Sequence, residues 1–112
     1  EVVNSVITKL KENNLVNNER FAGAYVSNRK RKGFGPKKIF YELLSKGVNE
    51  SVIETIISEE GGWKKTAKLA FMKKFKDGPS SNTKEILKQK SFLQNRGFGF
   101  KEIDSVFTNN MV

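Results

Sequence analysis

The residues of this chain that could do chemistry are its cations, because two residue types that supply many catalytic groups are missing. The 112 residues contain no His and no Cys, whereas 21 Lys and Arg outnumber 12 Asp and Glu, for a net charge of +9. Without His and Cys the chain has no imidazole base, no thiolate nucleophile, no Cys or His zinc site and no disulfide. These absences exclude His- and Cys-based catalysis; we expect no cofactor and no metal, and the excess of cations leads us to expect a polyanionic partner.

The first group of candidate binding residues lies where one predicted helix ends and the next begins. It consists of Arg29, Lys30, Arg31, Lys32, Lys37 and Lys38. A helix dipole stabilises cations at the C-terminus by about 0.3–1 kcal/mol each, which accounts for one or two of them. Lys37 and Lys38 lie at a helix N-terminus, where the dipole disfavours cations, so they indicate an anionic partner. The free N–H groups at that N-terminus could also bind a phosphate or carboxylate.

The second group of candidates lies on a predicted helix that begins at Trp63. A step of about 100° per residue places four lysines opposite its apolar side. These are Lys65, Lys68, Lys73 and Lys76. A calmodulin-like target or a membrane-surface helix would expose the apolar side, which the repeat described below assigns to the core. The lysines fit a solvated face as well as a binding face.

Aromatic residues in two Gly-flanked turns have two interpretations. Such a ring can stack on a nucleic-acid base or fill the space between two helical units. We expect Phe98 to fill that space, and the sequence does not decide between the two roles for Phe34. Trp63, Phe71 and Phe75 are expected in the core.

The elements that must position these residues are helices, because apolar residues recur at helical spacing almost everywhere. The pattern predicts helices over residues 2–10, 18–32, 36–46, 50–60, 63–76, 82–96 and 100–107, with no strand. Pro36 suits a first helical turn, and Asn49 can cap the next helix. Asn82 followed by Glu85 matches a capping box. The expected fold is all-α.

A shift of 50 residues superposes parts of the chain on one another. The superposed sets are Val3, Ile53 and Ile103; Val6, Ile56 and Val106; Ile7, Ile57 and Phe107; Phe21 and Phe71; Leu43 and Leu93; Lys46-Gly47 and Arg96-Gly97; Val48 and Phe98. This register predicts tandem three-helix repeats: residues 1–16 as the last helix of a truncated first unit, 17–60 as a second unit and 61–112 as a third. Such an array would be elongated and curved, right- or left-handed, with a long accessible face.

Two stretches of the chain resemble the RecX regulatory proteins. The first comprises Asn17-Asn18-Glu19-Arg20-Phe21-Ala22, Tyr25-Val26, Arg29, Lys32-Gly33, Ile39, Glu42-Leu43 and Lys46-Gly47-Val48, and is similar to the family's central repeat. The second comprises Ala67, Ala70, Lys73-Lys74, Phe92-Leu93, Arg96-Gly97-Phe98, Ile103 and Val106, and is similar to the C-terminal repeat. The resemblance spans nearly all of the chain. One departure is Asn18, where the family usually has Asp.

The resemblance implies three tandem three-helix units and a function without enzymatic activity. Members of this family bind the RecA recombinase filament, lodge in its groove, and restrain its growth or promote its disassembly. They thereby lower the DNA-dependent ATPase, strand exchange and coprotease activities of RecA, and so modulate DNA repair and the SOS response. On this basis we expect the ten cations named above to contact acidic RecA surface, nucleoprotein phosphate, or both.

Two other functions are compatible with the pattern. One is a helix-turn-helix protein that binds single- or double-stranded DNA directly, with the helix from Glu50 as reader; Glu50, Glu54, Ser58 and Glu59 would make that surface acidic. The other is a passive helical adaptor. In all cases we expect a cytoplasmic monomer without a membrane span, and the start at Glu1 indicates a piece of a longer protein.

Overall fold

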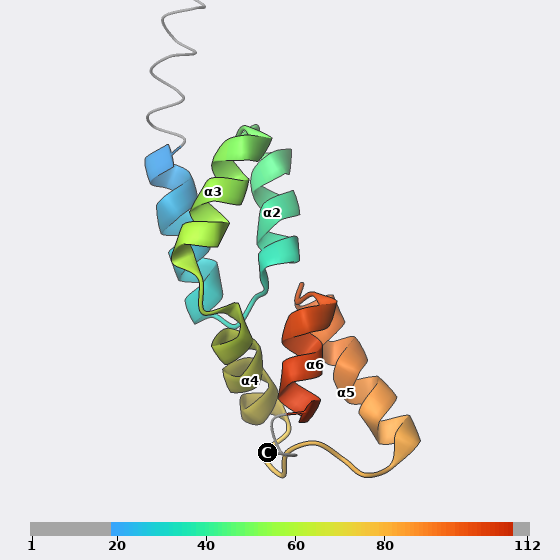
Figure 1. The fold of residues 1–112 in the computed structure, drawn as a ribbon. Coiled ribbons are helices and arrows are strands. Elements are labelled where there is room, and N and C mark those ends of the chain that lie inside the picture. Colours follow the sequence, from blue (N-terminus) through green and yellow to red (C-terminus); the bar gives the residue numbers. More distant parts are fainter. Residues whose placement is uncertain (1–18, 109–112) are drawn as a thin grey trace, which may run out of the picture.

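The computed structural model describes residues 19–108 (Figure 1). Within this range the chain forms six helices and no strand, which confirms the all-α prediction. The helices are one over residues 19–31, α2 (Pro36–Ser45), α3 (Glu50–Glu60), α4 (Trp63–Lys74), α5 (Thr83–Asn95) and α6 (Phe100–Thr108). No helix in this range is long and apolar enough to cross a membrane. The predicted helix over 2–10 lies outside the described residues.

The helix ends follow local signals in the sequence. Pro36 occupies the start of α2, where its missing N–H is no loss. The Asn49 side chain accepts a hydrogen bond from the Ser51 N–H at the start of α3. After α2, Gly47 has a φ of +87°, a left-handed conformation that glycine adopts with little cost.

The start of α5 carries half of the predicted capping box. The Asn82 side chain accepts hydrogen bonds from the N–H groups of Lys84 (2.9 Å) and Glu85 (3.3 Å). The reciprocal bond is missing, because the Asn82 N–H donates to the Ser80 hydroxyl at 3.0 Å instead of the Glu85 carboxylate. The prediction was therefore right about the cap and wrong about the box.

The end of α4 corrects the placement of one candidate lysine. α4 ends at Lys74 with Phe75 as its C-cap. Lys76 consequently lies in the loop between α4 and α5, not on the lysine-bearing face of the helix.

The helices enclose two clusters of buried apolar residues, each built from three consecutive helices. The first cluster contains Ala22, Val26, Ile39, Leu43, Val48 and Ile53, and the second contains Ala67, Phe71, Leu93, Phe98 and Val106. Figure 1 shows helix 19–31, α2 and α3 at one end of the molecule and α4, α5 and α6 at the other. This is the tandem three-helix arrangement that the repeat predicted.

The division of the chain into units at residue 60 stays a prediction. Trp63, a residue past that boundary, joins the two groups of helices. Trp63 begins α4 but packs against the first cluster. Its indole N–H donates to the Ile57 carbonyl of α3 at 2.9 Å.

The predicted 50-residue register is wrong for the first helix of each unit. Phe21 is 44 % exposed, whereas Phe71, its supposed equivalent, is fully buried. The buried positions on these helices match at a spacing of 45 residues: Ala22 with Ala67 and Val26 with Phe71. The later pair Leu43 and Leu93 keeps the spacing of 50. The register thus shifts by 50 − 45 = 5 residues between Phe71 and Leu93, and most of this shift comes from the loop between α4 and α5, which has 8 residues (75–82) against 4 (32–35) in the first unit.

Several large apolar side chains of the helices face solvent. Leu44, Leu87 and Phe100 are 41 %, 59 % and 82 % exposed. Phe100 is the first residue of α6. Helical periodicity places a residue on a side of its helix, but the width of the covered stripe depends on the neighbouring helices.

The two units meet through direct backbone hydrogen bonds. The N–H groups of Gly35 and Lys37, at the start of α2, donate to the carbonyls of Arg96 (2.7 Å) and Gly97 (2.9 Å) in the turn between α5 and α6. A Cβ atom on Gly35 would overlap the Gly97 backbone, and one on Gly97 would overlap Lys38. The junction therefore requires glycine on both sides.

Candidate anion-binding groove

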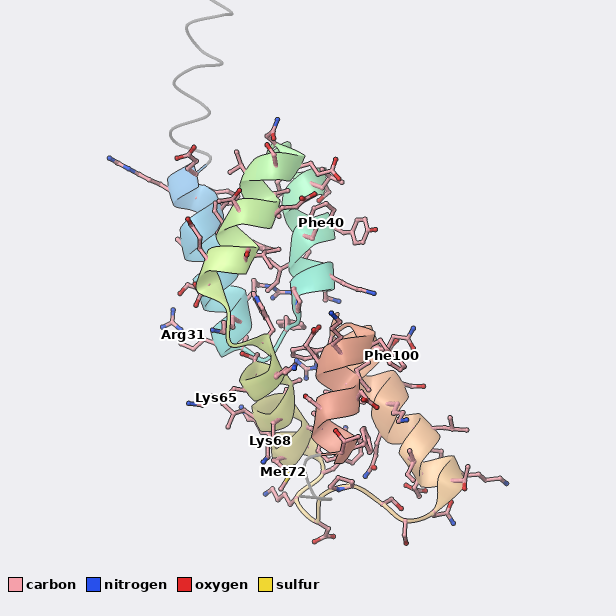
Figure 2. All side chains as sticks on the ribbon, in the orientation of Figure 1. Arg31, Phe40, Lys65, Lys68, Met72 and Phe100 are labelled. Carbon is pink, nitrogen blue, oxygen red and sulfur yellow. The ribbon has the colours of Figure 1, made fainter. Side chains whose placement is uncertain are left out.

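A groove of about 640 Å³ lies beside the junction, between the end of helix 19–31 and α4. We call it the basic groove, because seven of its lining residues are cations and only Glu60 is acidic. The cations are Lys30, Arg31, Lys32, Lys65, Lys73, Lys74 and Arg96. Figure 2 shows Arg31 and Lys65, one from each wall, on the same side of the molecule. The groove thus combines side chains from both three-helix units.

A close approach of two backbones forms the groove. Gly33, which follows helix 19–31, has a φ of +91°, and a Cβ built on it would lie 3.4 Å from the Ala70 Cβ. The small side chain of Ala70 and the absence of one on Gly33 let the turn lie against α4. Lys65 and Lys73 lie about 80° apart around α4, since eight residues turn a helix by about 800°, and both line the groove.

Arg96, at the end of α5, reaches the groove by packing over aromatic rings. Its guanidinium carbon lies 4.9 Å from the centroid of the Phe34 ring and 5.2 Å from that of Phe92. Lys74 also lies over Phe92, at 5.9 Å. These cation–π contacts hold cations at the inner edge of the groove.

Arg29 belongs to the run of basic residues from 29 to 32, but it forms an ion pair within its own unit instead of lining the groove. It donates to both carboxylate oxygens of Glu42, from Nε at 3.1 Å and from a terminal nitrogen at 2.8 Å. Its guanidinium also lies 3.8 Å from the centroid of Phe34. The charge of Arg29 is therefore neutralised within the first unit, and the residue does not line the groove.

The Glu42 carboxylate accepts a third hydrogen bond, from the Tyr25 hydroxyl at 2.8 Å. Partial burial acts to raise the pKa of Glu42, but the hydrogen bonds from Arg29 and Tyr25 outweigh it, with help from nearby positive charges, and hold that pKa below its ordinary value of 4.5. Burial, followed by the bond to Glu42 and its charge, raises the pKa of Tyr25 above 10.0.

Lys30 lines the groove but is already paired. Its ammonium donates to the Glu60 carboxylate at 3.3 Å and lies 5.5 Å from the centroid of the Trp63 ring. Arg31, Lys32, Lys65 and Lys73 are exposed. Lys74 is exposed as well but lies over Phe92, so those four are the exposed cations of the groove that no carboxylate or aromatic ring of the described residues engages.

The other predicted candidates lie outside the groove. Lys37 is at the start of α2, where its N–H and that of Gly35 are taken by the junction. Lys38 lies 5.5 Å from the centroid of Phe34. Lys68 is exposed on α4 but does not line the groove, and Lys76 is in the following loop.

The predicted site residues did not include Lys74, Arg96 or Leu69, which line the groove. The sequence pointed to Arg96, because the repeat aligns it with Lys46 and both residues precede a Gly in a turn. The sequence also pointed to Leu69, since it lies four residues from both Lys65 and Lys73, the spacing of neighbours on one face of a helix.

The two turn aromatics fill space. Phe98 is 1 % exposed in the second core, as predicted. Phe34 packs against the first core and lies beneath Arg29 and Arg96, so it has the filling role that the sequence left undecided.

The surface of α3 differs in charge from the groove. Glu50, Glu54 and Glu59 are all exposed on it, as the sequence suggested. Such a helix would be repelled by a phosphate-lined groove of DNA.

Comparison with known proteins finds relatives over nearly the whole chain. Residues 17–56 match the family model described as "RecX, second three-helix domain". A regulatory protein RecX from Pectobacterium atrosepticum is 34 % identical over 110 residues, which cover 97 % of this chain and 68 % of the relative. The regulatory protein RecX of Yersinia pseudotuberculosis is 33 % identical over 112 residues, with coverages of 99 % and 62 %. That of Serratia proteamaculans is 34 % identical over 107 residues, with coverages of 95 % and 64 %.

Proposed function

The chain belongs to the RecX family of regulatory proteins, and on this premise we propose that it binds the RecA recombinase filament on single-stranded DNA. Binding inhibits filament growth and lowers the ATPase, strand exchange and coprotease activities of RecA. The chain thereby modulates DNA repair and the SOS response. Its role is regulatory, carried out by binding and not by catalysis.

The observation that supports this proposal most is the basic groove. Seven cations against one carboxylate, in a chain with a net charge of +9, form a site for a strongly anionic partner. Such a field accelerates encounter with a large anionic assembly, while shape complementarity fixes the register of binding. A nucleoprotein filament is an assembly of this kind.

The position of the groove also supports binding to an extended partner. Its walls come from both units, which the backbone bonds of Gly35 and Lys37 hold in fixed relation. A partner in the groove therefore contacts two units at once. Separate contacts held by one rigid body bind with less loss of entropy than the same contacts on a flexible chain.

The proposal is tested by neutralising the groove and a matched set of cations. In the first variant Arg31, Lys32, Lys65 and Lys73 are replaced by Gln. In the second, Lys64, Lys84, Lys88 and Lys101, which are exposed and outside the groove, are replaced by Gln. Each variant loses four charges, so the net charge of both is 9 − 4 = +5.

The measurement is the ATPase rate of RecA on single-stranded DNA across a range of concentrations of each variant. We expect the groove variant to need about tenfold more protein, or greater, for half inhibition, which corresponds to four partly screened ion pairs. We expect the matched variant to differ by less than about threefold, since distant exposed charges are largely screened. No inhibition by the unmodified chain at several-fold excess would contradict the function, and equal losses in both variants would contradict the site.

A further inference from the structure

The basic groove contains one feature that a purely anionic ligand would leave unused. Leu69 lies among the groove's cations and is 62 % exposed. It is four residues after Lys65 and four before Lys73, so the three side chains form a row along one face of α4. Ala70 and Phe92 line the groove as well. The groove thus offers an apolar contact between two positive charges.

The order cation, apolar residue, cation has a spacing that fits an extended peptide. At 1.5 Å per residue, Lys65 and Lys73 are about 12 Å apart along the helix axis, with Leu69 about 6 Å from each. In an extended chain, side chains on one side recur every second residue, about 7 Å apart. A segment with an acidic, any, aliphatic, any, acidic pattern therefore places each carboxylate near a lysine and its aliphatic side chain over Leu69.

The opposite wall is suited to the same segment. Arg31 and Lys32 are exposed there, at the end of helix 19–31. Carboxylates on the other side of the extended segment can pair with them, because successive side chains point to opposite sides. Carboxylates on both sides of the extended segment would then pair with cations of the groove.

Single-stranded nucleic acid fits the groove less well. Proteins bind it by combining cations with aromatic rings on which bases stack. The aromatic residue of this groove, Phe92, is half-buried and lies under Arg96 at 5.2 Å and Lys74 at 5.9 Å. Its ring is engaged by the protein's own cations, and the sugar carbons of a nucleic-acid backbone offer less apolar surface to cover Leu69 than a leucine side chain does.

We propose that the basic groove binds an extended acidic segment of a protein chain, with an aliphatic side chain packed on Leu69 and flanking carboxylates on Lys65 and Lys73. The inference rests on the function proposed above for the source of the segment, which would be a protein component of the filament and not its DNA. The chemistry of recognition is independent of that source.

The test uses synthetic probes and this chain alone. The first probe is a short fluorescent peptide with the sequence Glu-Ser-Leu-Ser-Glu at its centre. The second has the same composition, with its Leu moved to the end, and the third is an oligothymidylate of equal charge. Fluorescence anisotropy at near-physiological salt measures the affinity of each probe. We expect the first peptide to bind about fivefold or more tightly than the second, from burial of part of a leucine side chain.

Two matched variants isolate the apolar contact. Leu69→Gln should weaken binding of the first peptide by about fivefold to tenfold and leave oligothymidylate binding unchanged. Leu87→Gln, at a leucine that is 59 % exposed on α5 and outside the groove, should change neither affinity. Both leucines are exposed, so circular dichroism should show intact helices in both variants.

The possible outcomes separate this inference from the proposed function. Equal affinity for both peptides, binding that prefers oligothymidylate, or no effect of Leu69→Gln would each overturn the inference. If the pattern of affinities is as expected but the chain does not inhibit the RecA ATPase, the groove's ligand class stands and the proposed function fails. If the chain inhibits RecA but does not discriminate between the peptides, only the inference fails.

Discussion

Glu42 joins α2 to helix 19–31 through three hydrogen bonds. It accepts two from Arg29 and one from Tyr25, and its side chain is 24 % exposed. An ion pair of this geometry, with two parallel N–H donors, is stronger than a typical surface pair. Because the bonds stabilise the carboxylate form, the pKa of Glu42 is lower in the folded chain than in the unfolded chain.

We therefore predict that Glu42→Gln destabilises the chain by about 1–2 kcal/mol at neutral pH, as expected for loss of charge-assisted hydrogen bonds. A carboxyl whose pKa is lowered by folding contributes stability above its unfolded value, and loses that contribution as pH falls through its folded value. The difference in free energy of unfolding between the wild-type chain and Glu42→Gln should therefore be largest at pH 7 and should shrink below about pH 4.5. Urea unfolding followed by circular dichroism at several pH values measures it.

The matched control for this prediction is Glu54→Gln. Glu54 is exposed on α3, so the substitution should change stability by less than about 0.5 kcal/mol at any pH. A pH-independent loss in Glu42→Gln would mean that packing, and not the charge of Glu42, is responsible.

The same residues show what sequence cannot decide at this scale. The run from Arg29 to Lys32 consists of cations only, yet Arg29 and Lys30 are paired while Arg31 and Lys32 are exposed. Their partners, Glu42 and Glu60, lie 13 and 30 residues further along the chain. Only the packing of α2 and α3 brings those carboxylates near, so spacing within the run carries no signal of it.

At the scale of the element, local chemistry decided most boundaries. The helix starts at Pro36 and after Asn49 and Asn82 were predictable, because each residue satisfies or replaces an unpaired backbone N–H group by itself. The repeat register was less secure. It held where a basic residue and Gly coincide, at Lys46-Gly47 and Arg96-Gly97, and failed for Phe21, where an apolar residue alone was matched.

The cap of α5 allows a direct test of this local chemistry. Asn82→Ala removes the acceptor of two backbone N–H groups and should cost about 1 kcal/mol. Glu85→Gln should cost less than about 0.5 kcal/mol, because its side chain does not complete the box. Thermal unfolding of both variants measures the difference, and equal losses would show that Glu85 takes part in the cap.

The basic groove is a property of the whole molecule, and so the sequence predicted its charge but not its shape. Arg31 and Lys32 come from one unit, while Lys65, Lys73 and Arg96 come from the other. They meet because the start of α2 docks on the turn at Gly97. Nothing in the periodicity of either unit specifies that contact, although the Gly residues at both positions are visible in the sequence.

The last prediction concerns the dependence of the groove on this junction. Gly35 has a φ of −91°, which any residue adopts, so Gly35→Ala causes no backbone strain of its own. Its Cβ would overlap the Gly97 backbone. Separation of the two units should then weaken binding of the acidic peptide by about tenfold or more without removing a single charge, since the two walls no longer face one partner.

Gly47→Ala is the control, because its φ of +87° imposes about 1–2 kcal/mol of strain in open space, away from the junction. That variant should lose stability and keep its affinity, whereas Gly35→Ala should lose affinity at temperatures where its helices are intact. Wild-type affinity in Gly35→Ala would show that each wall of the groove binds on its own.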